Sequence, residues 1–174
     1  MNNKLHILII AGGIFFLNAC IPDATVNPDP EPVQTTDLGS WTLDGTTNNV
    51  EYSSRSDIGD FHLTAESAPP DPKTSSINRC DIYYDGGLPK TMDYAIVNSR
   101  DSFGTVSKYV FIEVSELLSG SLYRSMNEPT SKATFVLSDD GRITARVQDI
   151  KLVKYYGKGK DTVSFSCEIT ERKN

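Results

Sequence analysis

Histidine and cysteine are scarce in this chain, which has two histidines and three cysteines among its 174 residues. A zinc site needs three or four ligands at close spacing, whereas the cysteines at positions 20, 80 and 167 are far apart. A Ser-His-Asp triad would have to use His62, and no Gly-x-Ser-x-Gly segment is present to position its serine. We therefore predict no catalytic set, no metal and no cofactor, and we interpret His62 as a solvent-facing strand residue.

Long hydrophobic runs are also missing. The longest covers residues 7–17, and eleven helical residues are too few to cross a hydrocarbon core of about 30 Å. Lys4 precedes the run and no acid does, which is typical of a secretory signal peptide. No segment keeps a helical 3.6-residue period for eleven residues or more, so no long helix is predicted.

A cysteine follows the apolar run almost directly. Leu17-Asn18-Ala19-Cys20 resembles the lipobox of bacterial lipoproteins, with Asn18 where a small or hydroxyl residue is commoner. The resemblance implies that residues 1–19 are cleaved as a signal peptide and that the Cys20 thiol receives a diacylglyceryl group. In such lipoproteins a third acyl chain, palmitate or a similar one, is often added to the new α-amine of the cysteine. Two or more acyl chains anchor a protein stably. In such lipoproteins an aspartate directly after the cysteine retains the protein at the inner membrane of a Gram-negative envelope. This chain has Ile21 there, which implies the outer membrane. The resemblance does not decide between the periplasmic face and the surface face of that membrane. The alternative is an ordinary signal peptide and a chance cysteine.

Residues 20–37 combine prolines with acids. The prolines at 22, 28, 30 and 32 exclude a helix or central strand, so we predict an extended tether of about 3 Å per residue. After the signal, the chain has 16 basic and 23 acidic residues, a formal charge of −7, which makes nucleic acid a poor partner. The expected partners are the membrane, through the lipid on Cys20, and an envelope protein or glycan.

Residues 38–174 alternate short strand patterns with turn residues. Val, Ile, Thr, Tyr and Phe dominate the apolar content, which suits half-buried strands. Asp140-Gly141 predicts the clearest hairpin. Strands are predicted at residues 38–43, 50–53, 61–66, 77–84, 93–98, 108–115, 133–137, 142–154 and 162–170, with one helical turn at 115–119. The pattern indicates an all-β domain, a single antiparallel β-sandwich of about eight to ten short strands.

The apolar alternation in residues 142–154 changes register once. Up to Val147 the apolar residues occupy odd positions, whereas Ile150 and Leu152 continue on even positions. Because strand side chains alternate between the two faces of a sheet, this shift predicts a β-bulge near Gln148-Asp149.

Two cysteines remain in the predicted mature domain. Cys80 shares a strand face with Ile82, and Cys167 shares one with Phe165, so both are expected to point inward. An even pair in an exported domain usually forms a disulfide, which in the chain-entropy estimate stabilises by about 4–5 kcal/mol. The alternative is two buried free thiols. A redox pair would show C-x-x-C spacing, which these residues lack.

Five aromatic residues are candidates for stacking on a sugar. They are Trp41, Tyr83, Tyr84, Tyr155 and Tyr156. Aromatic residues on strands more commonly pack in the core or across strands. A glycan-binding role is therefore the alternative for these side chains.

Two resemblances bear on the fold. Gly39-Ser40-Trp41 and residues 92–94 (Met-Asp-Tyr) resemble the Gly-x-Trp and Thr-Asp-Tyr signatures of lipocalins, although the second lacks its threonine. That resemblance implies a calycin-like barrel carrying a small apolar ligand. As a whole, the mature chain is more similar to small β-sandwich lipoproteins of Gram-negative envelopes, through its tether, first-strand Trp41 and Asp140-Gly141 hairpin. That resemblance implies no activity, so we expect a non-enzymatic binding module, with the ligand-carrying barrel as the alternative.

Overall fold

The computed structural model describes residues 37–58, 61–67, 77–85, 87, 89–104 and 108–173. The predicted signal peptide, the predicted lipidation site at Cys20 and all of the tether but Asp37 lie outside the described residues. In the described part, the regular elements are ten strands and one three-residue 3-10 helix, η1 (Arg100–Ser102). The predicted all-β class is confirmed.

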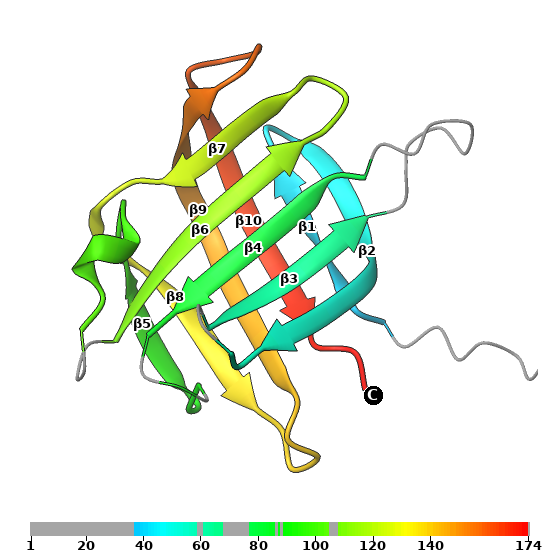
Figure 1. Ribbon diagram of the computed structural model, residues 1–174, viewed down its shortest axis with the longest axis vertical. Helices are drawn as coiled ribbons and strands as arrows, with labels where there is room; N and C mark the ends of the chain where they lie inside the picture. The colour runs from blue at the N-terminus through cyan, green and yellow to red at the C-terminus, as the bar shows by residue number, and fades with distance from the viewer. Residues whose placement is uncertain are drawn as a thin grey trace, which may run out of the picture. The chain divides into compact units, whose positions relative to one another are not determined.

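Nine of the ten strands overlap a predicted strand (Figure 1). β7 has no predicted counterpart. The helical turn predicted at 115–119 is wrong, because β6 continues through its first two residues and a turn follows. The strands are β1 (Gly39–Leu43), β2 (Thr46–Ser56), β3 (His62–Ser67), β4 (Arg79–Tyr84), β5 (Met92–Ile96), β6 (Tyr109–Glu116), β7 (Ser121–Ser125), β8 (Glu128–Leu137), β9 (Ile143–Tyr156) and β10 (Thr162–Thr170).

Hydrogen bonding connects all ten strands into one sheet that closes on itself. The order is β10-β1-β2-β3-β4-β6-β5-β8-β9-β7, and additional β10–β9 and β6–β7 pairings complete the ring. The β5–β6 pair is parallel and joins only Ala95 to Tyr109 and Ile96 to Val110. The prediction of a purely antiparallel sheet needs correction at this pair, since the connection through η1 returns the chain to the same end of the sheet before β6 begins.

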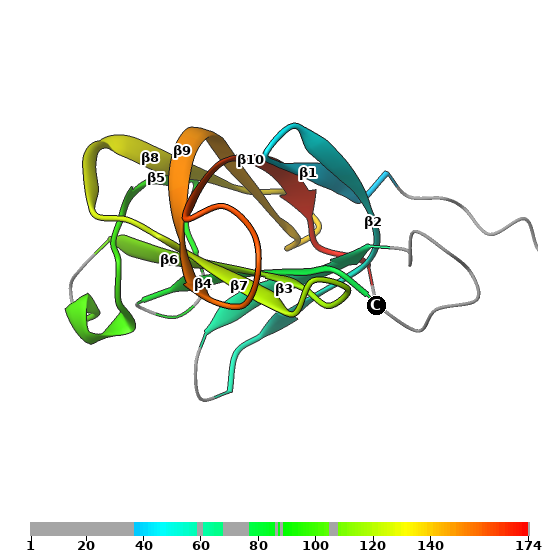
Figure 2. The same cartoon turned by 90° about the horizontal axis from the view of Figure 1, so that it is seen from above.

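The ring is arranged as two facing layers. Figure 2 shows β8, β9, β10 and β1 above β3, β4, β6 and β7, with β2 at the side. β2 pairs with both β1 and β3, so it carries the hydrogen bonding from one layer to the other. The domain thus has the layers of a sandwich and the closed hydrogen bonding of a barrel.

The space between the layers is filled by side chains. Trp41, Tyr84, Phe135 and Phe165 are the largest of the fully buried residues, and they belong to one continuous apolar cluster. Burying a large apolar side chain contributes about 1.5–3 kcal/mol, so this cluster is the main source of stability.

The bulge predicted in β9 is confirmed. The register between β9 and β10 shifts between Val147 and Ile150, both of which are buried. Asp149 takes a φ of 47°, and its N–H donates to Ser166 Oγ at 3.0 Å. The bulge therefore keeps the apolar residues on both sides of it in the core.

A seam lies between β5 and β7, which both pair with β6 but at opposite ends of that strand. Ser125, at the end of β7, is 1% exposed and lies in this seam. Its hydroxyl donates to the Val97 carbonyl at 2.6 Å and accepts from the Ile112 N–H at 3.0 Å. The Ser125 side chain thus hydrogen-bonds two backbone groups in the seam, where β5 and β7 do not pair with each other.

Candidate binding surface around β7

The two cysteines of the domain lie in its core. Cys80 on β4 is 0% exposed and Cys167 on β10 is 6% exposed, so the predicted inward orientation is confirmed. Both are free thiols in the structure, and the predicted disulfide is not formed in it. Burial raises the pKa of both thiols, that of Cys167 to about 12, and the proximity of Cys167 adds to the rise at Cys80. Buried thiols with raised pKa values react slowly, so neither is a candidate nucleophile.

The five aromatic residues considered for sugar stacking separate into two groups. Trp41 and Tyr84 are each 1% exposed and belong to the core. Tyr83 lies half-buried on the outer face of β4. Tyr155 and Tyr156 are 62% and 57% exposed at the end of β9. Only the last two present most of their surface to solvent.

Tyr83 belongs to a row of ring contacts across three strands. Its ring centroid lies 5.1 Å from that of His62 on β3 and 5.9 Å from that of Phe111 on β6. Arg100 covers the Tyr83 ring, with its guanidinium carbon 4.6 Å from the centroid. Burial raises the pKa of the Tyr83 phenol. His62 lies on the outer face as predicted. The Tyr83 ring is thus in contact with His62, Phe111 and Arg100 of the same domain.

Exposed apolar side chains gather around β7. Of seven large apolar side chains exposed in the described part of the chain, five surround this strand: Leu117, Leu118, Met126, Tyr155 and Tyr156. The leucines form part of the β6–β7 turn, the methionine follows β7, and the tyrosines end β9, which pairs with β7. We call these five residues the β7 patch. Clustered apolar exposure of this kind marks interaction sites.

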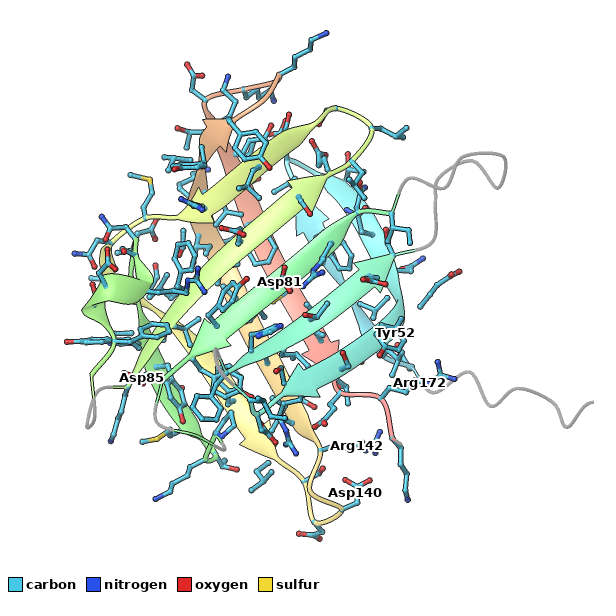
Figure 3. The ribbon with its side chains drawn as sticks, in the orientation of Figure 1. Tyr52, Asp81, Asp85, Asp140, Arg142 and Arg172 are labelled. Carbon is cyan, nitrogen blue, oxygen red and sulfur yellow. The ribbon has the colours of Figure 1, made fainter. Side chains whose placement is uncertain are left out.

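A groove of about 520 Å³ lies on one side of the patch. Its charged lining consists of three carboxylates and one guanidinium: Glu66, Asp81, Glu113 and Arg79. Its apolar lining includes Leu117, Leu122 and Tyr156. Figure 3 shows Asp81 near the middle of the layer that contains β3, β4 and β6. We call this the acidic groove, because its lining carries a net charge of −2.

A second hollow of about 440 Å³ lies beside the end of β7. Its charged lining residues are Arg124 and Lys154, with no carboxylate among the residues that line it. Asn98, Asn127, Met126 and Tyr155 complete most of its surface. We call this the basic pocket.

Arg124 joins the two hollows. It lies on the same face of β7 as Leu122, two residues earlier, which lines the acidic groove. Its Nε forms an ion pair of 2.8 Å with Glu113. Its guanidinium carbon lies 3.6 Å from the centroid of the Tyr155 ring, in cation–π contact. The charged and apolar parts of this surface are therefore held in fixed positions.

Two of the three carboxylates of the acidic groove, those of Asp81 and Glu113, are already partnered. Asp81 and Glu113 stand directly opposite each other on β4 and β6. Arg79 pairs with Asp81 at 2.8 Å, and Thr64 Oγ1 donates to the same carboxylate at 2.6 Å. The ion pair with Asp81 raises the pKa of Arg79. Each of these two carboxylates is thus engaged with its own cation, which fixes its position in the groove.

Other kinds of site receive no support from the described residues. They contain no group of three or more His, Cys, Asp or Glu side chains placed to hold a metal ion. Nor does any helix among them have the length and apolarity to span a membrane. Comparison of the chain with protein-family models, curated proteins and solved structures finds no match.

Proposed function

We propose that this protein is a non-enzymatic interaction module of the bacterial cell envelope, held at the outer membrane by a lipid on Cys20 and binding through the β7 patch. The observation that carries the binding part is the gathering of five of the seven exposed large apolar side chains around one short strand. Water contact with apolar surface costs about 25 cal/mol per Å², so a cluster of this kind favours a partner that covers it. The lipidation part rests on the lipobox resemblance at residues 17–20.

The residue types in the patch also suit recognition. Tyr, Met and Arg are enriched in protein interfaces, and the strongest contributions come from aromatic and Arg anchors. Tyr155 with Arg124 stacked against it is such an anchor, because their contact restricts both side chains before a partner arrives. A glycan partner would use the same exposed tyrosine rings.

The alternative of a barrel that carries a small apolar ligand draws support from the closed ring of strands. The interior, however, is occupied by Trp41, Tyr84, Phe135 and Phe165 within one packed cluster. A ligand there would have to displace core side chains. This packing favours binding on the outside of the ring.

Site-specific photo-cross-linking in the native cells tests the proposal. A photoreactive phenylalanine analogue replaces Tyr155 in the β7 patch, and Tyr52 on β2 provides the matched control, since it is also an exposed tyrosine, at 44%. We expect a discrete cross-linked protein from position 155 and none from position 52. No adduct at position 155, or equal adducts at both positions, contradicts a binding role for this patch.

A further inference from the structure

We propose that the basic pocket binds an uncharged sugar unit carried by the partner of the β7 patch, with the Tyr155 ring as the surface on which the sugar lies. This deepens the proposed function and rests on it, because Tyr155 and Met126 belong both to the β7 patch and to the lining of the pocket. The inference comes from which polar groups of the pocket are free to bond a ligand.

The two cations of the pocket are already neutralised within the chain. Arg124 forms its ion pair with Glu113 at 2.8 Å, and Lys154 Nζ forms one with Asp161 at 2.8 Å. Lys154 Nζ also donates to the Gly159 carbonyl at 2.9 Å. An anionic ligand would have to compete with these carboxylates, so a negative charge gives it little advantage over a neutral ligand.

The polar groups that remain free in the pocket are uncharged. The carboxamides of Asn98 and Asn127 are exposed, and neither makes a side-chain hydrogen bond within the part of the chain that the structure describes. Each carboxamide offers two N–H donors and one carbonyl acceptor, and a hydroxyl group both donates and accepts. The two side chains can therefore bond the hydroxyls of a sugar in either direction.

Tyr155 supplies the apolar surface that a sugar ring needs. Its side chain is 62% exposed, and the Arg124 guanidinium carbon lies 3.6 Å from its ring centroid. Because that contact already holds the ring, less side-chain freedom is lost when a ligand binds. A pyranose has C–H groups on its faces and hydroxyls around its edge, so it matches an aromatic ring with carboxamides beside it.

The strand pairing at the pocket argues against an extended peptide as the ligand. A peptide that adds to a sheet needs a strand edge with open backbone groups. β7 pairs with β6 along one edge and with β9 along the other, so its own edges are occupied. A ligand of the pocket is therefore held by side chains, as the hydroxyls of a sugar can be. The volume of about 440 Å³ lies in the range of about 300–1,000 Å³ that is typical of small-ligand sites.

Saturation-transfer NMR on the full chain, in a detergent whose head group is not a sugar, tests the inference. The neutral probes are lactose, maltotriose and triacetylchitotriose, and sialyllactose is the acidic match of lactose. The test variants are Tyr155→Ala and the double variant Asn98→Ala/Asn127→Ala. Tyr52→Ala and Asn49→Ala are the matched controls, since both residues are exposed on β2 and lie outside the lining of the pocket.

We expect at least one neutral probe to bind with a Kd of about 1 mM or below, and each test variant to bind it at least about tenfold more weakly, with both controls unchanged. Sialyllactose should bind no more tightly than lactose, because the cations of the pocket are paired. Tyr155→Phe keeps the ring and should bind nearly as well as the unchanged chain. That variant replaces Tyr155→Ala as the test of the ring if the alanine variant does not fold, with Tyr155→Leu as its non-aromatic counterpart.

Three results overturn the inference: no neutral probe bound at about 10 mM, test variants that bind as well as the unchanged chain, or sialyllactose bound at least about tenfold more tightly than lactose. The cross-linking described above separates this failure from failure of the proposed function. A cross-linked partner at position 155 without sugar binding keeps the β7 patch as a binding surface and rejects a sugar as the group that the pocket recognises.

Discussion

Ser125 is the residue on which the seam of the ring most depends. Its hydroxyl satisfies the Ile112 N–H and the Val97 carbonyl, and all of these groups are buried. Leaving a buried donor or acceptor without a partner costs about 1–3 kcal/mol. The sequence contains no indication of this role, since a serine at a strand end has no distinctive pattern.

We predict that Ser125→Ala lowers the free energy of unfolding by about 2–3 kcal/mol, because two buried backbone groups lose their partner. Ser54→Ala on β2 is the matched control, since no side-chain hydrogen bond holds Ser54 in the described structure, and it should change stability by less than about 0.5 kcal/mol. Urea unfolding measures both. Equal effects of the two substitutions would show that the hydroxyl does not hold the seam.

The thiols give a prediction about pH. Their pKa values in the folded protein are raised by burial, so the stability they contribute is fully present below the thiol pKa of the unfolded chain, about 8.5, and is lost as pH rises toward the folded value. For Cys167 the folded pKa is about 12. We expect the reduced protein to lose stability above a pH of about 8.5 more steeply than the double variant Cys80→Ala/Cys167→Ala, as followed by urea unfolding at a series of pH values. Parallel pH profiles would contradict this assignment.

The predicted Cys80–Cys167 disulfide is tested by the same unfolding curves. Its formation transfers two protons and two electrons to a disulfide exchange partner, which is reduced to two thiols, and it abolishes the thiol titration. Protein purified without reductant should then be more stable than reduced protein near neutral pH, by about 4–5 kcal/mol in the chain-entropy estimate. Identical curves with and without reductant would mean that the thiols stay free, as they are in the structure.

At the scale of elements, strands with regular alternation were predictable and β7 was not. β10 matches its prediction at both ends, because its buried residues occupy every second position. β7 has four buried residues among five and therefore shows no alternation. The polar start of β2 was also missed, since its strand conformation comes from pairing with β1 and not from an apolar face. Without β7, the gathering of exposed residues around it could not be anticipated.

The contact between the β6–β7 and β9–β10 turns yields a prediction for this element. Gly157 has a φ of 97°, and a Cβ there would lie 2.3 Å from the Gly120 carbonyl oxygen. We expect Gly157→Ala to destabilise the protein by at least about 2 kcal/mol, from backbone strain plus this clash. Gly141→Ala is the control, since its φ is 82° but a Cβ would contact nothing, so its cost should be about 1 kcal/mol. Thermal unfolding distinguishes the two; equal shifts would contradict close packing of the turns.

At the scale of the whole molecule, the all-β fold class could be predicted from local sequence patterns. The closure of the strands into a ring could not. Short alternating segments and turn residues predict an all-β domain, and the bulge in β9 is visible in the sequence as a register change. Ring closure depends on pairings between strands distant in the sequence, such as β1 with β10 and β7 with β9. The candidate site combines residues from β3, β4, β6, β7 and β9, so it exists only after those pairings form.

The central claim is that this module works at a membrane, attached by a lipid on Cys20. The most direct test is the intact mass of the protein extracted from the membrane fraction of its native cells. We predict a chain that begins at Cys20 and is heavier than its residues by two or three acyl chains, and a Cys20→Ser variant that lacks this added mass and leaves the detergent phase. A chain that begins elsewhere, or one with no acyl mass on Cys20, would contradict the account.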